Sequence, residues 1–357
     1  MVSQDRSKSL LEQVQAAIKQ QSPISIEGGG SKGFYGYQPS PGQTRLDVSG
    51  HRGVIDYEPG ELVLRVRAGT PLSEINQLLG ENNQMLAFEP PDFETKSTIG
   101  GVIASGLSGP RRPYAGSARD FVLGVTLMTG SGEILEFGGQ VMKNVAGYDV
   151  SRLLTGSLGT LGVILDVSLK VLPAAEKEIT RSIDVAVNDF QTLLQSMQRT
   201  MPISAAAYAD AQLLVRLSGS AVAVDTAAHL IDGDEADHRY WDDLNTLGCF
   251  SRVKNLWRVS VAPASKLFLD DAVVIDWGGG IRWLADPGFE PREVLAGKDG
   301  NAEDGHATLM KYDRAHRSSG LEIFQPLTEP LLSIHKKIKH QFDPASIFNP
   351  GRMYRDI

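Results

Sequence analysis

The first residues that could do chemistry form a glycine-rich loop, Gly28-Gly29-Gly30-Ser31-Lys32-Gly33. Glycines leave backbone N–H groups accessible, so such a loop after a strand can form a nest for an anion. The spacing also satisfies G-x-G-x-x-G, and Asp47 sits near the distance of a ribose-binding acid. That dinucleotide motif needs a helix directly after the glycines, and two prolines and two glycines in residues 34–42 exclude one. The loop therefore predicts either an anion site or a plain tight turn, and not a Rossmann fold.

Three further segments combine glycine with small or hydroxyl residues: 97–104, 143–149 and 155–164. In the first of them, Gly100 and Gly101 would let a ligand approach the main chain closely. Each segment alone is a weak signal, because a Gly-Ser-x-Gly sequence also suits a hairpin and Lys143 also suits a solvated surface. The order and spacing of the segments along the chain carry more information than any one of them.

Other side chains offer less specific chemistry. Arg258 and Arg282 could each fork onto a carboxylate, although outward-facing positions on strands are the favoured interpretation. The seven histidines form no His-x-x-x-His or His-x-Glu-x-His pair, so we expect no metal site. The single cysteine, Cys249, can form neither an internal disulfide nor an iron–sulfur cluster, and a buried apolar role is expected for it.

The elements that must position these residues follow from hydrophobic spacing and turn signals. Helical spacing predicts an amphipathic helix over 9–20, and Thr70 is expected to cap a helix that begins at Pro71. Residues 286–306 are polar and contain Gly and Pro, so they predict a loop. Further helices are expected over 187–199, 221–230 and 331–342, and strands over 23–27, 45–49, 62–69, 121–128, 163–172, 213–217, 256–261, 273–277 and 307–311.

Length and composition favour an α+β protein of two domains. A chain of 357 residues is too long for one core, and a composition change at 173–176 marks the boundary. We expect a first domain of two small αβ subdomains over 1–175, a cap domain with an antiparallel sheet covered by helices over 176–330, and a segment over 331–357 that returns to the first domain. The net charge of −8 argues against nucleic acid, and no apolar run is long enough to span a membrane.

The order of these motifs resembles the FAD-binding half of the vanillyl-alcohol-oxidase (PCMH-type) flavoproteins. More closely, it resembles the family of FAD-binding E subunits of glycolate oxidase, also called glycolate dehydrogenase. The resemblance covers essentially the whole chain and is strongest over 97–172. The residues that carry it are 28–33, 98–101, 109–112, 119–120, 143–149, 156–162, 342–344 and 348–352.

The resemblance implies an FAD whose pyrophosphate lies on the 28–32 and 98–101 backbones, with residues around 144–164 enclosing the adenosine and flanking the flavin. Alternatives stay open for three residues: Tyr148 as a packing residue, Asp149 as a cap or as the partner of Arg152, and Arg111 as a solvated charge. The cofactor-contacting residues that the resemblance implies are Gly28, Gly29, Gly30, Ser31, Lys32, Thr98, Gly100, Gly101, Ala104, Arg111, Asn144, Gly147, Tyr148, Asp149, Ser157, Gly159, Gly162, Ile164 and Asn349.

Some members of the superfamily attach FAD through a histidine or cysteine near the first glycine loop. Ser31 and Lys32 occupy that place here and His51 lies outside it, so non-covalent binding is expected. The resemblance implies one subunit of a complex that oxidises glycolate, a 2-hydroxy acid, to glyoxylate, with a companion FAD-binding subunit and an iron–sulfur subunit. The expected location is the cytoplasm, with any contact to the inner membrane made through these partners. The alternatives are a stand-alone FAD-dependent oxidoreductase with Arg258 and Arg282 at its site, and a flavin-free scaffold.

Overall fold

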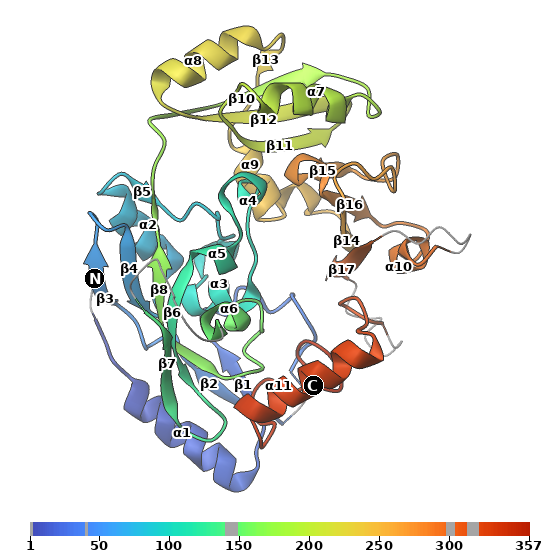
Figure 1. Cartoon of the computed structure of the whole chain (residues 1–357). Coiled ribbons are helices and arrows are strands. Elements are labelled where there is room, and N and C mark those ends of the chain that lie inside the picture. The colour runs from blue at the N-terminus through green and yellow to red at the C-terminus, as the bar shows by residue number, and fades with distance from the viewer. Residues whose placement is uncertain (1–2, 40–41, 140–148, 298–303, 313–320) are drawn as a thin grey trace. The chain divides into compact units, whose positions relative to one another are not determined.

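The computed structural model describes residues 3–39, 42–139, 149–297, 304–312 and 321–357 (Figure 1). The chain forms two compact units. Unit 1 comprises Met1–Ser108, Gly116–Ala174 and Pro326–Ile357, and unit 2 comprises Gly109–Ala115 and Ala175–Gln325. The short insertion Gly109–Ala115 lies inside the range that the sequence assigned to the first domain, and nothing in its composition predicts that it belongs with unit 2.

Unit 1 contains a five-stranded antiparallel sheet in the order β3-β4-β8-β6-β7. Its central strand β8 is buried along most of its length, and it pairs with β4 on one side and β6 on the other. Helix α3 packs on β4 and β8, and α6 packs on β6 and β7. The bounds are Val54–Glu58 (β3), Val63–Arg67 (β4), Val163–Lys170 (β8), Val122–Met128 (β6), Ile134–Gly138 (β7), Leu72–Gly80 (α2), Ile99–Ser105 (α3), Ala118–Phe121 (α5) and Val150–Leu154 (α6).

A second, smaller part of unit 1 is built on the parallel strands β1 (Ile24–Glu27) and β2 (Thr44–Asp47). Helix α1 (Ser7–Gln20) buries Leu10, Val14 and Ala17 against this pair, since these residues recur at helical spacing. The C-terminal segment joins the same core, because Phe348 bridges to Ile24 in parallel and is fully buried. Helix α11 (Glu329–Phe342) leads into it (Figure 1). A two-stranded sheet pairs β5 (Gln84–Met85) with β9 (Leu172–Pro173), and a 3-10 turn, η1, spans Phe93–Thr95.

The start of α2 corrects one expectation. Pro71, and not Thr70, is the cap residue of this helix, and the cap makes no side-chain hydrogen bond. The Thr70 hydroxyl is used elsewhere: it accepts from the backbone N–H of Gly53 at 2.8 Å and donates to the Arg67 carbonyl at 2.7 Å. The hydroxyl of Thr70 therefore bonds to Gly53 and Arg67 and does not cap α2 as the sequence predicted.

Unit 2 is an eight-stranded antiparallel sheet in the order β13-β10-β12-β11-β15-β16-β14-β17, which confirms the α+β class and the antiparallel cap sheet. Helices α7 and α8 pack on its first half. The expected loop over 286–306 is wrong in part, because it contains α10 and the start of β17. The bounds are Lys177–Asp184 (β10), Ile203–Ala209 (β11), Gln212–Gly219 (β12), Asp234–Glu235 (β13), Leu256–Val261 (β14), Val274–Asp276 (β15), Ile281–Ala285 (β16), Gly305–Lys311 (β17), Arg112–Ala115 (α4), Phe190–Gln198 (α7), Ala221–Leu230 (α8), Tyr240–Asn245 (α9), Pro291–Leu295 (α10), Gly248–Phe250 (η2) and Trp277–Gly279 (η3).

Candidate functional site

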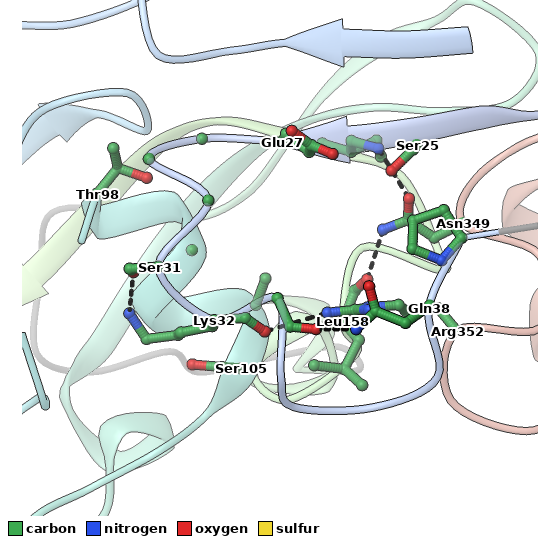
Figure 2. A pocket seen from close by; sticks show the side chains of 18 residues that line it. Ser25, Glu27, Ser31, Lys32, Gln38, Thr98, Ser105, Leu158, Asn349 and Arg352 are labelled. Atoms are coloured by element: carbon green, nitrogen blue, oxygen red, sulfur yellow. Dashed lines mark hydrogen bonds between the residues drawn. The ribbon is translucent and has the colours of Figure 1, made fainter. Parts of the chain in front are cut away.

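A pocket in unit 1 opens where β1 runs into the first glycine loop (Figure 2). It holds about 820 Å³ of empty space, counting the part that is open to solvent, which is within the range of small-molecule and cofactor sites. The walls come from four stretches of chain that are far apart in sequence. The lining residues are Ser25, Ile26, Glu27, Gly28, Gly29, Gly30, Ser31, Lys32, Gly33, Gln38, Pro39, Thr98, Gly101, Ala104, Ser105, Leu158, Asn349 and Arg352.

The glycine loop forms the first wall, and it leaves little room for side chains. A Cβ at Gly28 would overlap the Thr98 hydroxyl, and one at Gly29 would overlap the Lys96 carbonyl. Gly30 has φ = +71°, which an L-residue rarely adopts. Residues 31–39 form turns and not a helix, which confirms that the loop is not of the Rossmann type. Within the described chain, the N–H groups of residues 29–31 donate to no other backbone group.

Lys32 gives the loop its charge. The Lys32 ammonium donates to Ser97 Oγ at 2.7 Å and lies 5.6 Å from the centroid of the Phe93 ring. Burial lowers the pKa of Lys32 to about 8, and the carboxylate of Asp92 opposes this shift only in part. The Lys32 ammonium has therefore lost hydration, and the nearby carboxylate replaces it only in part. A bound anion would supply the remaining counter-charge.

Thr98 and α3 form the second wall. The Thr98 hydroxyl is buried and has no hydrogen-bond partner among the described residues, although Thr98 lines the pocket (Figure 2). A β-bridge between Thr98 and Pro71 fixes its position. The two glycines that follow, Gly100 and Gly101, are needed for different reasons. A Cβ at Gly100 would lie 2.6 Å from the Cβ of Ala68, so that glycine allows close packing on the sheet, whereas Gly101 faces the pocket.

The third wall joins the 156–160 loop to the C-terminal turn. Backbone hydrogen bonds tie this loop to α3, from Gly156 N to Ile103 O at 2.9 Å and from Leu158 N to Ala104 O at 2.8 Å. Asn349 connects it to β1, as Figure 2 shows: the Asn349 Nδ2 group donates to Leu158 O at 2.7 Å, and Asn349 Oδ1 accepts from Ile26 N at 2.8 Å.

A buried ion pair holds the C-terminal turn against this loop. The Lys339 ammonium donates to Asp343 Oδ2, to Thr160 O and to Phe348 O, each at 2.7 Å. Both charged residues are buried, Lys339 at 4 % exposure and Asp343 at 0 %. The Asp343 carboxylate also accepts from the backbone N–H groups of Ile347 and Phe348. One cation thus links α11, the 156–160 loop and the strand-like segment that carries Asn349.

The structure gathers about half of the cofactor residues that the sequence analysis names. Those on the pocket are Gly28, Gly29, Gly30, Ser31, Lys32, Thr98, Gly101, Ala104 and Asn349. Gly100, Ser157, Gly159, Gly162 and Ile164 lie in the same unit but do not line it. Gly159 supports the wall instead, because its φ of +70° and its approach to the Asn349 amide leave no room for a Cβ. Asn144, Gly147 and Tyr148 lie outside the described residues.

Two further named residues have partners within their own units. Asp149 caps α6, accepting from the N–H of Arg152 at 3.1 Å, and also pairs with its guanidinium at 3.0 Å. Arg111 belongs to unit 2, where it pairs with Glu178 and donates to Ser218 Oγ at 3.1 Å. The Asp149 contacts match the alternatives that the sequence left open, whereas Arg111 is buried and paired and is therefore not the solvated charge that was considered.

Sequence reasoning missed several lining residues, among them Ser25, Gln38, Leu158 and Arg352. The guanidinium of Arg352 donates to the carbonyls of Lys32 and Tyr37, so it closes the end of the glycine loop. A local signal existed for Arg352, which follows the Asn349-Pro350-Gly351 turn directly. For Gln38, which donates to the Gly33 carbonyl, no pattern in the surrounding residues pointed to the pocket.

Unit 2 places the two arginines considered for a carboxylate in different settings. Arg282 is fully buried and donates to the carbonyls of Gly279, Ser265 and Leu267. Arg258 is half-buried and stacks on Trp277, with its guanidinium carbon 4.4 Å from the ring centroid. In the described ranges, no three His, Cys, Asp or Glu side chains gather in a way that would suit a metal ion. Every helix of the described chain is too short or too polar to cross a bilayer.

Comparison with known proteins gives one matching family model and two relatives. A family model for an FAD binding domain matches residues 5–138. The glycolate oxidase subunit GlcE of Escherichia coli (strain K12) is 42 % identical over 357 residues, covering 99 % of each chain. The glycolate oxidase subunit GlcD of Bacillus subtilis (strain 168) is 31 % identical over 160 residues, which are 44 % of this chain and 33 % of that protein.

Solved structures share the fold. Substrate-bound p-cresol methylhydroxylase has a TM-score of 0.70 at 14 % identity, covering 99 % of this chain and 88 % of that one. An alkyldihydroxyacetonephosphate synthase has a TM-score of 0.69 at 18 % identity, covering 98 % and 75 %. The fold is therefore the PCMH-type FAD-binding fold that the motif order predicted.

Proposed function

This chain belongs to the family of the glycolate oxidase subunit GlcE, and from that premise we propose that it is the FAD-binding subunit of a multi-subunit oxidase or dehydrogenase of glycolate and related 2-hydroxy acids. FAD binds non-covalently in the pocket of unit 1 and takes part in electron transfer as glycolate is oxidised to glyoxylate. The partners are a companion FAD-binding subunit similar to GlcD and an iron–sulfur subunit. The complex is cytoplasmic, and its contact with the inner membrane runs through those partners.

One observation carries the proposal: the unsatisfied donors of the pocket fit a diphosphate. The N–H groups of residues 29–31 donate to no backbone group of the described chain, the Thr98 hydroxyl is buried without a partner, and the Lys32 ammonium is desolvated. Each of these groups would gain a charge-assisted hydrogen bond from a pyrophosphate. The glycines keep the loop narrow enough for that contact to be made by the main chain.

Different residues of the pocket would then contact different parts of FAD. The 28–32 loop and Thr98 hold the diphosphate, and Lys32 neutralises part of its charge. Leu158, Asn349 and the backbone around them form the wall against which the rest of the cofactor lies. When bound, FAD supplies a two-electron acceptor that protein side chains cannot provide. The contribution of this chain is to bind and orient that acceptor and to exclude water from it.

The composition of the pocket supports non-covalent attachment. No cysteine or histidine is among its described lining residues. Cys249 lies in unit 2, and His51 is engaged elsewhere in unit 1, where it accepts from the N–H of Arg6 at 3.0 Å. Serine and lysine occupy positions 31 and 32, and neither forms the usual covalent link to a flavin.

An absorption spectrum of the purified full chain tests the cofactor. The protein is then denatured and the supernatant is analysed for flavin. We expect flavin bands in the native protein and FAD in the supernatant. Flavin that stays with the precipitate would contradict non-covalent attachment. A chain that binds no flavin after incubation with FAD, both alone and when co-expressed with its partners, would overturn the proposal in favour of a scaffold.

The relay role has its own test. Glycolate-dependent reduction of a dye is measured for the FAD-loaded chain alone and for the chain co-expressed with a GlcD-type companion and the iron–sulfur subunit. We expect sustained turnover only from the assembled complex. Sustained turnover by the isolated chain would replace the subunit assignment with that of a stand-alone oxidoreductase.

A further inference from the structure

Helix α8 of unit 2 exposes an apolar side that its own unit does not cover (Figure 1). Val222 and Leu230, near the two ends of this helix, are 78 % and 69 % exposed. The other exposed large apolar side chains in the described ranges reach at most 49 %. Single exposed apolar residues are normal on a protein surface, whereas a group of them on one element marks an interaction surface. The two side chains therefore call for a closer look at the whole outer side of α8.

The exposed residues of α8 form one continuous stripe. They recur at positions i, i+1, i+4, i+7 and i+8, which places them on one side of a helix. They are Val222, Ala223, Thr226, His229 and Leu230, and we call them the α8 stripe. On the opposite side, Val224 and Ala227 are buried in the core that α8 shares with β12. The α8 stripe thus crosses two turns of helix without a lysine, arginine, aspartate or glutamate.

Helix α7 provides a comparison within the same unit. It packs into the same hydrophobic core as α8, through Phe190, Leu194 and Met197. Its exposed residues are all polar: Thr192, Gln195, Ser196 and Gln198. A helix that packs on this half of the sheet can therefore present a polar outer side, as a solvated surface helix normally does. Packing against the sheet does not account for the apolar outer side of α8.

An acidic border follows the α8 stripe. Asp232, Asp234 and Glu235 come within five residues of the end of α8, and all three are exposed. The last two form β13, the edge strand of the sheet, which pairs with β10. Within the described chain, none of the three carboxylates forms an ion pair. The charges nearest to the stripe on α8 and β10, Asp225 and Lys177, pair with each other at 2.6 Å. The border therefore adds unbalanced negative charge beside an apolar surface.

The sign of this charge selects the occupant. A second copy of the chain that used the same surface would bring acid against acid, because a two-fold interface pairs each patch with itself. An anionic lipid surface would be repelled for the same reason. A protein surface with an apolar centre and lysine or arginine at its rim is complementary in both respects, since interfaces keep apolar groups at the centre and charges at the rim.

We propose that the α8 stripe and its acidic border form a docking surface for a partner protein that presents an apolar centre with a basic rim. Val222 and Leu230 are buried at the centre of the contact, and the removal of their apolar surface from water stabilises the complex. The carboxylates of the border meet basic side chains at the rim, where they speed and orient the encounter. That the partner is a subunit of the glycolate-oxidising complex rests on the proposed function, whereas the surface itself rests on unit 2.

Titration of the companion FAD-binding subunit and the iron–sulfur subunit onto the full, FAD-loaded chain tests this surface. Val222→Lys combined with Leu230→Lys is expected to raise the dissociation constant about tenfold or more, because it buries ammonium groups in the apolar centre and opposes the basic rim. Thr192→Lys combined with Gln195→Lys is the matched control, which adds the same charge to the exposed side of α7. It is expected to leave the dissociation constant within about twofold, since exposed charges away from the contact have little effect.

A second pair of changes tests the acidic border. Asp234→Asn combined with Glu235→Gln is expected to weaken binding about fivefold at low salt, chiefly through a slower association rate, and to make binding less dependent on salt. The control is Glu12→Gln combined with Glu61→Gln, which removes two exposed carboxylates of unit 1. It is expected to leave the association rate and its salt dependence close to those of the wild type. Association rates at several salt concentrations measure both pairs.

The outcomes separate this surface from the proposed function. Wild-type affinity in the α8 lysine variant, with its flavin content and melting temperature unchanged, would overturn the surface and leave the subunit assignment intact. A wild-type chain that binds FAD but neither subunit would overturn both. A wild-type chain that sediments as a dimer, and that the α8 lysine variant returns to a monomer, would assign the stripe to a second copy and overturn the proposed partner. If the lysine variant does not fold, the Asp234→Asn and Glu235→Gln pair decides.

Discussion

Thr98 and Thr155 each bury a hydroxyl that finds no partner in the described part of unit 1. Such a group costs about 1–3 kcal/mol of folding free energy. The two threonines differ in one respect: Thr98 lines the pocket and Thr155 does not. An unsatisfied hydroxyl inside a pocket is explained if a ligand completes it, and this makes Thr98 the most direct residue-level evidence for a bound diphosphate.

The pair provides a matched test. Thr98→Val is expected to raise the free energy of unfolding of the flavin-free protein by about 1 kcal/mol, because it removes an unpaired polar group at equal volume. The same change is expected to weaken FAD binding about tenfold, which corresponds to one lost hydrogen bond to a charged group. Urea denaturation and quenching of flavin fluorescence measure the two effects. Thr155→Val should reproduce the first effect without the second, and equal losses of affinity in both variants would contradict this account.

Lys32 makes FAD binding depend on pH. Its pKa is lowered to about 8 in the free protein, from an ordinary value of 10.5. A bound diphosphate favours the ammonium form and raises the pKa, so binding takes up a proton between pH 8 and the raised value. FAD affinity is therefore expected to fall as the pH rises above 8. Lys32→Met should bind FAD about tenfold more weakly at pH 7 and lose the dependence, since it removes the titrating charge.

The control for that profile is Lys32→Arg. Arginine keeps its charge throughout this range, so its affinity should stay constant up to about pH 9.5. Flavin fluorescence titrations at fixed ionic strength measure all three profiles. A wild-type curve that runs parallel to that of Lys32→Met would show that Lys32 does not contact the bound anion.

At the scale of elements, α11 matters because of one buried cation. Lys339 links this helix to the 156–160 loop and to the segment that bridges β1, through its contacts with Asp343, Thr160 and Phe348. No periodic pattern predicts this, because lysine is rarely buried and the helical face shows only its apolar spacing. The helix itself was predicted from that spacing; its anchor was not.

Removing the anchor should be costly. Lys339→Met leaves the buried Asp343 carboxylate without its counter-charge, and the free energy of unfolding is expected to fall by about 3–5 kcal/mol. Lys336→Met on the same helix is the control. Lys336 is exposed and lies 3.9 Å from Asp356, so its loss should cost less than about 1 kcal/mol. Denaturant unfolding of both variants measures the difference. A loss for Lys339→Met that is as small as that for Lys336→Met would show that the Lys339 contacts contribute little.

Helices and strands were predicted well where the local spacing of apolar residues determines them. They were predicted poorly where contacts with residues far away in the sequence determine them. Helix 221–230 and strand 256–261 match the observed α8 and β14 residue for residue. The strand that carries Arg282 and the helix at Pro291–Leu295 were missed, because their apolar residues are interrupted by charges and turns. The pocket followed the same division: its glycine loops were visible in sequence, whereas Gln38 and Leu158 reach it through tertiary contacts alone.

For the whole molecule, the division into two units gives a fluorescence test. All four tryptophans, Trp241, Trp257, Trp277 and Trp283, belong to unit 2, so their emission reports that unit. A chain that ends at Gln325 lacks Asn349, Arg352 and the partner of Ile24. We expect it to bind no FAD, because the part of the pocket that Asn349 and Arg352 form is missing, and to keep the blue-shifted tryptophan emission of a folded unit 2. Retention of FAD by this shortened chain would contradict the role given to the C-terminal segment.

The return of residues 326–357 to unit 1 also sets an order of events during synthesis. Ile24 leaves the ribosome long before Phe348, yet the two are bridged in one core. Unit 2 has all of its chain once Gln325 is made, so the unit that is started first is completed second. Until residues 326–357 emerge, the nascent chain lacks the part of the pocket that Asn349 provides, and cofactor loading is therefore expected to follow their synthesis.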